Sequence, residues 1–174
     1  MDHSGHAPYD VALLMLRLVI GLFFVAHGVN KVIGGLDGTA RWFAGIGMKW
    51  PSVQARIAAV TEIGAGLLFA AGLLLPFSAA GIVGVMLVAI VVAHLKAGFF
   101  VFAPGQGWEY CATIAAVAVA VAFAGPGRWS VDHLLDISPD TWGGTWASGL
   151  IAVILGAGSA ALQLAVCYRP AARS

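Results

Sequence analysis

The sequence predicts an all-α, polytopic membrane protein: a four-helix bundle with a fifth transmembrane helix at its C-terminal end. Two observations lead to this fold class. Hydrophobic residues make up 60% of the 174 residues and charged residues only 10%, whereas a soluble domain carries about 25% charged residues. The apolar residues are also gathered in five long runs, each suited in length to a spanning helix. We therefore treat residues 1–174 as a single membrane domain.

The first predicted span covers residues 11–29. The segment before it, MDHSGHAPYD, is polar and lacks the basic stretch of a secretory signal, so we expect this apolar run to be retained as a helix. The connection that follows, residues 34–52, contains the segment TARWFAGIGM, in which Thr39 can serve as the N-cap of a short helix. Its aromatic side chains and amphipathic pattern predict a helix lying at the membrane interface.

Four further spans complete the predicted fold. They cover residues 53–75, 77–94, 108–124 and 146–166. Pro76 predicts a tight turn between the second and third spans, and the motif GPGRWS ends the fourth. In the fifth span, Gly149, Gly156 and Gln163 lie seven residues apart on one helical face, a pattern that favours close packing against a neighbouring helix.

Aromatic residues support the same division of the chain. All six tryptophans and all three tyrosines fall at the ends of predicted helices or in the connections. Tryptophan and tyrosine are enriched at membrane–water interfaces. Their positions therefore mark the helix ends independently of hydropathy.

Lysine and arginine are distributed unequally between the two sides of the predicted bundle. One side carries Lys31, Arg41, Lys49, Arg56, Lys96, Arg169 and Arg173, the other carries only Arg128, and Arg17 lies within the first span. Basic residues are retained preferentially on the cytoplasmic side. We therefore expect a multi-pass protein of the plasma membrane with its N-terminus outside and its C-terminus in the cytoplasm.

Polar and ionisable side chains gather near the cytoplasmic end of four predicted helices. A charged side chain at mid-helix costs about 2.5–3.5 kcal/mol by insertion scales, so such groups persist where something neutralises or uses them. We expect Glu62 to pair with Arg17 or with Lys31. The predicted polar or ligand-binding cluster comprises Arg17, His27, Lys31, Glu62, His94, Lys96, Glu109 and Tyr110. The catalytic candidates among them are His27, Glu62, His94 and Glu109.

These side chains also have structural explanations. A buried ion pair can do no more than fix the register of two helices. The histidines can hydrogen-bond carbonyls at the interface, and lysines near helix ends can extend toward the headgroups. The convergence of polar groups from four helices is what favours a site.

Two kinds of chemistry use such groups. In the first, a quinone or similar redox molecule enters from the lipid, histidine and tyrosine donate hydrogen bonds to its carbonyls, and glutamate exchanges protons with it. In the second, His27 and His94 bind a metal or a haem b from facing helices. The chain has no HxxxH or ExxH motif, which argues against haem b, and we predict no metal site. Cys111 and Cys167 form no CxxC motif and are expected to be small, buried apolar residues.

Four ordered motifs carry a family resemblance. They are LRLVIGLFFVAHGVNKV, TEIGAGLLFAAGLLLP, AHLKAGFFVFAPGQGWEY and GPGRWSVD, within residues 13–135. In order and spacing this stretch resembles the DoxX family of small membrane proteins. The positions that match the family's hallmarks are Arg17, Gly21, His27, Gly28, Lys31, Glu62, Gly66, His94, Gly98, Phe99, Phe100, Glu109, Tyr110, Gly125, Gly127 and Asp132.

The resemblance implies a compact four-helix bundle, which residues 145–166 extend in this chain. It also implies a redox setting, because the family is named after a subunit of a terminal quinol oxidase that also works in thiosulfate:quinone oxidoreduction. Some relatives are membrane partners of soluble redox enzymes. The expected partners are thus the lipid bilayer, membrane or soluble redox proteins and further copies of the chain. Nucleic acid is not expected, because the sequence has no basic patch.

Fold does not determine function, so enzymatic activity stays open. The first hypothesis is a small subunit of a redox assembly that contacts quinone or a partner oxidoreductase through the polar cluster. The alternative is a non-catalytic scaffold or accessory subunit whose buried charges hold the helices together. A solute or proton pathway is a third, weaker hypothesis, because a single chain of 174 residues leaves little room for a gated route.

Overall fold

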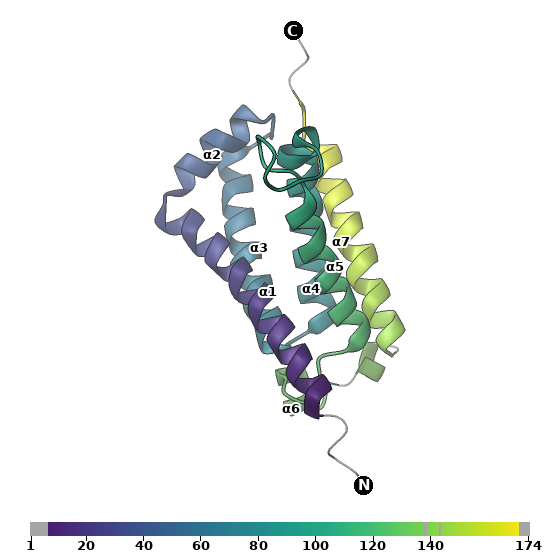
Figure 1. Cartoon of the computed structure of the whole chain (residues 1–174). Coiled ribbons are helices and arrows are strands. Elements are labelled where there is room, and N and C mark those ends of the chain that lie inside the picture. The colour runs from purple at the N-terminus through teal and green to yellow at the C-terminus, as the bar shows by residue number, and fades with distance from the viewer. Residues whose placement is uncertain (1–6, 138, 143, 171–174) are drawn as a thin grey trace.

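The computed structural model describes residues 7–137, 139–142 and 144–170, and these form an antiparallel bundle of long helices (Figure 1). The elements in chain order are α1 (Ala7–Ile33), α2 (Leu36–Gly45), α3 (Pro51–Ala71), α4 (Leu75–Ala89), α5 (Glu109–Ala124), α6 (Val131–Leu134) and α7 (Thr145–Cys167). A π-helical turn, Ile90–His94, and a 3-10 turn, Leu95–Ala97, extend α4, and a second 3-10 turn, Pro139–Trp142, precedes α7. The all-α polytopic fold predicted from the sequence is confirmed.

Four helical segments are long and apolar enough to cross a membrane: Ala7–Ile33, Pro51–Ala71, Leu75–Ala97 and Thr145–Cys167. The fifth long helix, α5, has 16 residues and is therefore about 24 Å long, somewhat shorter than a typical hydrocarbon core of about 30 Å. The C-terminal apolar run is thus a full-length helix. The predicted fourth span is the shorter one, because the loop before it, residues 98–108, takes up part of the bundle's height.

The helices alternate in direction, so that the N-terminal end of α1 and the C-terminal end of α7 lie at opposite ends of the bundle (Figure 1). Helix α1 packs on α3, α3 packs on α4, and α7 covers α4 and α5. Glycine allows the close contacts: a Cβ added at Gly21 would lie 2.5 Å from the carbonyl oxygen of Gly66. A Cβ at Gly156 would lie 2.7 Å from Val83 of α4, and one at Gly149 would overlap the ring of Phe123 of α5, so the predicted packing face of the last span meets both helices.

The short helix after the first span is present, but it differs from its prediction at the start. Helix α2 begins at Leu36, with Gly35 in the N-cap position and no side-chain cap. Thr39 therefore lies inside the helix and is not its N-cap. The reason is the backbone at Gly35, whose φ of 92° lets the chain turn into the helix directly after α1. Helix α2 packs on α3.

Large apolar side chains fill the inside of the bundle and also cover its outer surface, as expected for a protein surrounded by lipid. Inside the bundle lies a core that includes Phe24, Phe69, Leu75 and Ile82. The outer faces of α1, α3 and α7 expose many further large apolar side chains, among them Met15, Leu22, Val60, Leu67, Ile154 and Leu162. Such a surface would be unfavourable in water, and it is expected for helices surrounded by hydrocarbon.

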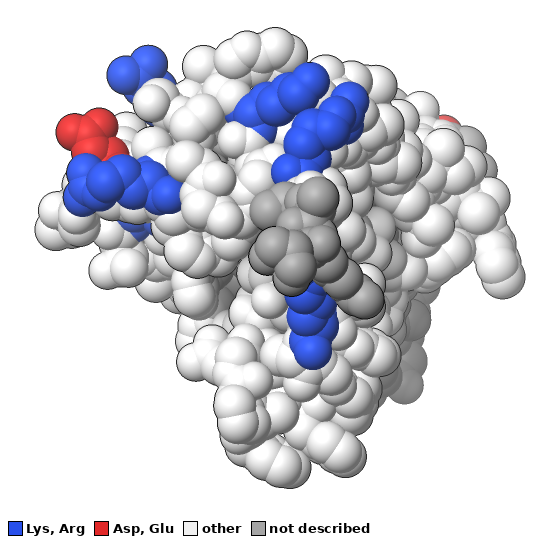
Figure 2. Space-filling model, turned by 90° about the horizontal axis from the view of Figure 1, so that it is seen from above, with Lys and Arg blue, Asp and Glu red and all other residues white. Residues whose placement is uncertain are grey.

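Charge is concentrated at one end. Figure 2 views the end that carries α2 and the C-terminal end of α7, and shows that lysine and arginine side chains on it cover more surface than acidic ones. We call this the basic end. The described basic residues there are Lys31, Arg41, Lys49, Arg56, Lys96 and Arg169. Arg173, which was predicted to share this side, lies outside the described residues.

Candidate functional site

The polar contact that the structure places deepest at the basic end is an ion pair between α1 and α3. The Lys31 ammonium lies 2.5 Å from the Glu62 carboxylate, and the two side chains are 22% and 9% exposed. The helices approach closely here, because a Cβ at Gly28 would lie 2.9 Å from the carbonyl oxygen of Ala59. Glu62 thus has a positive partner within an otherwise apolar span, which offsets the cost of keeping a charge there.

A second polar group lies where α4 ends and α5 begins. The Nδ1 atom of His94 lies 2.6 Å from the carbonyl oxygen of Gln106. The carboxylate of Glu109 accepts a hydrogen bond of 3.2 Å from the backbone N–H of Val101. Both side chains therefore hold the loop of residues 98–108. His94 itself ends a π-helical turn, a local distortion that is frequent at functional sites.

The loop of residues 98–108 is held by backbone as well as side-chain contacts. The N–H of Trp108 donates to the carbonyl of Gly98 at 3.1 Å, and the N–H of Glu109 donates to the carbonyl of Phe99 at 2.9 Å. The rings of Phe100 and Phe102 stack 5.1 Å apart, and Phe102 is 82% exposed. A fixed loop with exposed aromatic rings suits anchoring at the membrane interface.

The predicted cluster is thus divided in two within the described residues. Lys31 and Glu62 form one part, and His94 and Glu109 with their loop form the other, and no hydrogen bond or ion pair connects them. Three further members, His27, Lys96 and Tyr110, are exposed side chains on the surface of the bundle, and the eighth, Arg17, is buried elsewhere.

Arg17, the deepest charge predicted from the sequence, faces away from Glu62. Its guanidinium is fully buried and donates from Nη2 to the carbonyl oxygen of Trp129. It lies against the backbone of Gly72, in the turn between α3 and α4, where an added Cβ would overlap Nη1. Of the two pairings considered for Glu62, the structure therefore contains the one with Lys31. The Nε and Nη1 atoms of Arg17 have no hydrogen-bond partner among the described residues.

Asp132 has a role that reasoning from side-chain types did not identify. Its carboxylate accepts hydrogen bonds from the backbone N–H groups of Leu74, at 2.8 Å, and Leu75, at 3.1 Å. Its own N–H donates to the carbonyl of Gly72 at 2.9 Å. A buried carboxylate thus binds the N-terminus of α4, where unsatisfied N–H groups and the helix dipole favour a negative charge. The sequence signal was the motif GPGRWSVD, but nothing in the motif shows which helix it contacts.

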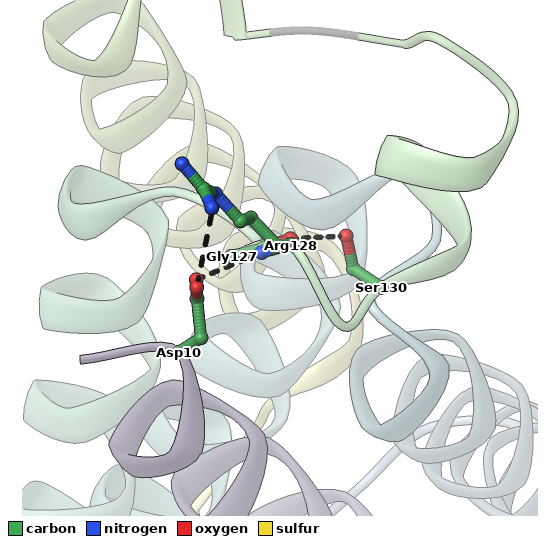
Figure 3. A network of polar contacts seen from close by, with 4 residues as sticks. All are labelled: Asp10, Gly127, Arg128 and Ser130. Carbon is green, nitrogen blue, oxygen red and sulfur yellow. Dashed lines mark hydrogen bonds and ion pairs between the residues drawn. The ribbon is translucent and has the colours of Figure 1, made fainter. Parts of the chain in front are cut away.

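The same end of the bundle carries a second buried carboxylate. Asp10 accepts a hydrogen bond of 2.9 Å from the backbone N–H of Arg128, and the Nε atom of Arg128 lies 4.0 Å from it (Figure 3). In the same turn the hydroxyl of Ser130 donates to the carbonyl of Gly127 at 2.6 Å. These contacts attach the start of α1 to residues 125–130. This polar network lies at the end of the bundle opposite the basic end, and its role is structural.

Metal-binding side chains and thiols complete the list of predicted sites. Among the described residues, no three His, Cys, Asp or Glu side chains lie close enough together to hold a metal ion. Cys111 and Cys167 are both buried free thiols, as predicted for small apolar residues.

Comparison with known proteins agrees with this fold and these motifs. The sequence model of the DoxX family matches residues 12–95. A Bacillus subtilis protein named "Putative oxidoreductase CatD" is 35% identical over 96 residues, covering 52% of this chain and 66% of its own. An uncharacterized membrane protein of Mycobacterium tuberculosis, Rv3486, is 30% identical over 138 residues, covering 75% of this chain and 85% of its own.

A shorter match links the chain to the inner membrane protein YphA of Escherichia coli, which is 36% identical over 66 residues, covering 38% of this chain and 46% of its own. No solved structure matches the chain. The family model covers most of α1, all of α2, α3 and α4, and the π-helical turn after α4, so its match includes Lys31, Glu62 and His94. Taken with the length of the mycobacterial match, this identifies the chain as a membrane protein of the DoxX family.

Proposed function

We propose that this protein is a small integral subunit of a membrane redox assembly. It presents the basic end of its bundle to a quinone or to a partner oxidoreductase. The observation that carries the proposal is the Lys31–Glu62 ion pair, which keeps two proton-exchanging groups 2.5 Å apart between spanning helices. A quinone partitions into the same hydrocarbon and must exchange protons when its redox state changes.

The chemistry divides between this chain and its partner. Reduction of a quinone to a quinol takes up two electrons and two protons. A partner oxidoreductase would supply the electrons. Glu62 can pass the two protons one after the other, taking each from water at the basic end, while Lys31 stabilises its carboxylate between transfers. His94 can hydrogen-bond a quinone carbonyl. In this proposal the chain binds, orients and protonates, and does not itself carry electrons.

Of the three relatives compared, one has a name that supports a redox role. The name of the Bacillus relative gives it as a putative oxidoreductase, and the match covers 66% of that protein. The names of the mycobacterial and Escherichia relatives state only a membrane location. The redox role therefore stands as a proposal for this chain.

A structural scaffold is the second candidate, and one observation favours it. Each buried carboxylate in the described part of the chain has a partner: Lys31 pairs with Glu62, two N–H groups at the start of α4 donate to Asp132, and the N–H of Arg128 donates to Asp10. Charges whose partners all lie within the fold need no ligand, and fixing the register of the helices is enough to explain them. The two candidates differ in whether removing one charge abolishes a binding event or only lowers stability.

Thermal stability in detergent with and without a short-chain quinone separates the two. Under the proposal, quinone raises the melting temperature of the wild type but not that of Glu62→Gln, and Asp136→Asn, an exposed change at the opposite end, responds like the wild type. Equal responses of the wild type and Glu62→Gln, or no response in either, would favour the scaffold.

Orientation in the membrane belongs to the same proposal. Six described basic residues lie at the basic end, whereas Arg128 lies opposite. By the positive-inside rule the basic end faces the cytoplasm. The Lys31–Glu62 pair would then lie near the cytoplasmic surface, within reach of a soluble electron donor.

A further inference from the structure

A hollow of about 260 Å³ opens at the basic end where three helix termini meet. It is lined by Val32 at the end of α1, Leu36 and Asp37 at the start of α2, and Ser52 and Arg56 in the first turns of α3. Three of these side chains are polar and two are apolar. Neither Lys31 nor Glu62 lines the hollow.

The charges in the hollow have opposite signs. Arg56 supplies a cation and Asp37 an anion, and both side chains are exposed. Within residues 7–137, 139–142 and 144–170 neither side chain forms an ion pair. A ligand carrying only negative charge would be attracted by Arg56 and repelled by Asp37. The complementary ligand therefore carries one negative and one positive group a short distance apart.

The position of the hollow limits the ligand further. It lies at the end of a spanning helix, where the exposed apolar side chain of Val32 and the half-buried Leu36 border the polar residues. Trp42 and Trp50, both exposed, belong to the same end of the bundle. Tryptophan there marks the level of the lipid headgroups, so a ligand at this depth is surrounded by headgroups and reaches acyl chains below.

We infer that the hollow binds the phosphoethanolamine headgroup of a membrane lipid. Arg56 and the hydroxyl of Ser52 contact the phosphate, Asp37 accepts hydrogen bonds from the primary ammonium, and Val32 and Leu36 contact the first carbons of the acyl chains. Basic pockets between helices at the cytoplasmic side bind the anionic headgroups of cardiolipin and phosphoinositides, whereas this hollow pairs one arginine with one aspartate. Here the added carboxylate selects for a headgroup that also carries a hydrogen-bonding cation.

Headgroup chemistry makes this selection specific. The ammonium of phosphoethanolamine has three N–H donors, as a lysine ammonium has, whereas the quaternary ammonium of phosphocholine has none. Phosphoglycerol carries the phosphate without any cation, so it leaves Asp37 facing a net negative ligand. The expected order of affinity is thus phosphatidylethanolamine first, with phosphatidylcholine and phosphatidylglycerol weaker.

Native mass spectrometry of the protein in detergent, titrated with each of the three lipids at equal acyl composition, tests the inference. The wild type should retain phosphatidylethanolamine more strongly than phosphatidylcholine by roughly fivefold or less, the size expected for one partly exposed ion pair. Asp37→Asn should remove this preference while leaving phosphatidylcholine binding unchanged, and Arg56→Gln should weaken binding of all three lipids.

Lys49→Gln is the matched control, because Lys49 is an exposed basic residue at the same end that does not line the hollow. It should behave as the wild type. Water-soluble glycerophosphoethanolamine carries the same headgroup without acyl chains, so it should displace the lipid only in large excess. Displacement at a concentration equal to that of the lipid would show that the acyl chains add nothing to binding, and the assignment to a membrane lipid would fail.

Equal binding of the three lipids to the wild type, or an unchanged preference in Asp37→Asn, would also overturn the inference. Each variant's melting temperature without added lipid shows that it is folded. The redox proposal does not depend on this outcome, because its variants lie at Lys31 and Glu62.

Discussion

The Lys31 ammonium and the Glu62 carboxylate lie 2.5 Å apart across the interface of α1 and α3. The sequence separates them by 31 residues and an intervening helix. Each charge would be costly alone in an apolar span, and each is stabilised by the other. The pair therefore stabilises the packing of these two helices. Among the described residues, it is also the one place at the basic end where an acidic and a basic side chain are in direct contact.

Removing one partner should cost more than removing both. Lys31→Met leaves the Glu62 carboxylate without its cation and should destabilise the protein by about 1–3 kcal/mol, less than for a fully buried pair because Lys31 is partly exposed. The double variant Lys31→Met/Glu62→Gln should recover much of this loss. Thermal unfolding in one detergent measures both, and a double variant less stable than either single variant would contradict the account.

Gly72 should not tolerate a side chain. Its φ of 65° is left-handed, and an added Cβ would overlap the Arg17 guanidinium. Gly72→Ala should therefore lower the melting temperature and the yield of folded protein, since the backbone alone costs an L-residue about 1–2 kcal/mol there. The control is Gly158→Ala on α7, where a Cβ meets nothing within 4 Å. If both substitutions were equally tolerated, the placement of Arg17 against Gly72 would be wrong.

Asp132 should act as the cap of α4. Asp132→Ala removes the acceptor of two backbone N–H groups and should cost about 1–2 kcal/mol, whereas Asp132→Asn keeps one acceptor oxygen and should cost less. Asp136→Asn, exposed and in the same segment, should have little effect on stability. Thermal unfolding of the three variants checks this order, and an Asp136 variant as unstable as Asp132→Ala would refute it.

Sidedness can be measured by labelling single cysteines in whole cells. In a background that carries Cys111→Ala and Cys167→Ala, a cysteine at position 49 should react with an impermeant maleimide only after the cells are opened. A cysteine at position 136 should react in intact cells, because it lies at the opposite end. The reverse pattern would overturn the orientation inferred from the basic residues.

Much of this architecture could be predicted from the sequence because hydrocarbon imposes simple rules on it. Apolar runs and interfacial tryptophans predicted five long helices, and all five are present. The pairing of Lys31 with Glu62 was one of two alternatives that helical spacing allowed. The choice between them depends on which way Arg17 extends, and no local pattern determines that.

The contacts that the sequence did not predict join distant segments through backbone atoms. The partner of Arg17 is the carbonyl of Trp129, 112 residues away. Asp132 binds the N–H groups of Leu74 and Leu75. Every residue has a carbonyl and nearly every residue an N–H, so side-chain chemistry cannot identify such partners. The separation of His94 and Glu109 from Glu62 likewise follows from the local hydrogen bonds of the 98–108 loop.

Photoaffinity labelling with an azidoquinone tests the central claim, that the basic end contacts a quinone, most directly. In protein reconstituted in lipid bilayers, mass spectrometry of the labelled peptides should place the adduct near Lys31 and Glu62 or on residues 94–110. Unlabelled quinone should compete, and Glu62→Gln should reduce the yield. Labelling spread over the lipid-facing surfaces of α1, α3 and α7, without competition and unchanged in Glu62→Gln, would contradict the claim.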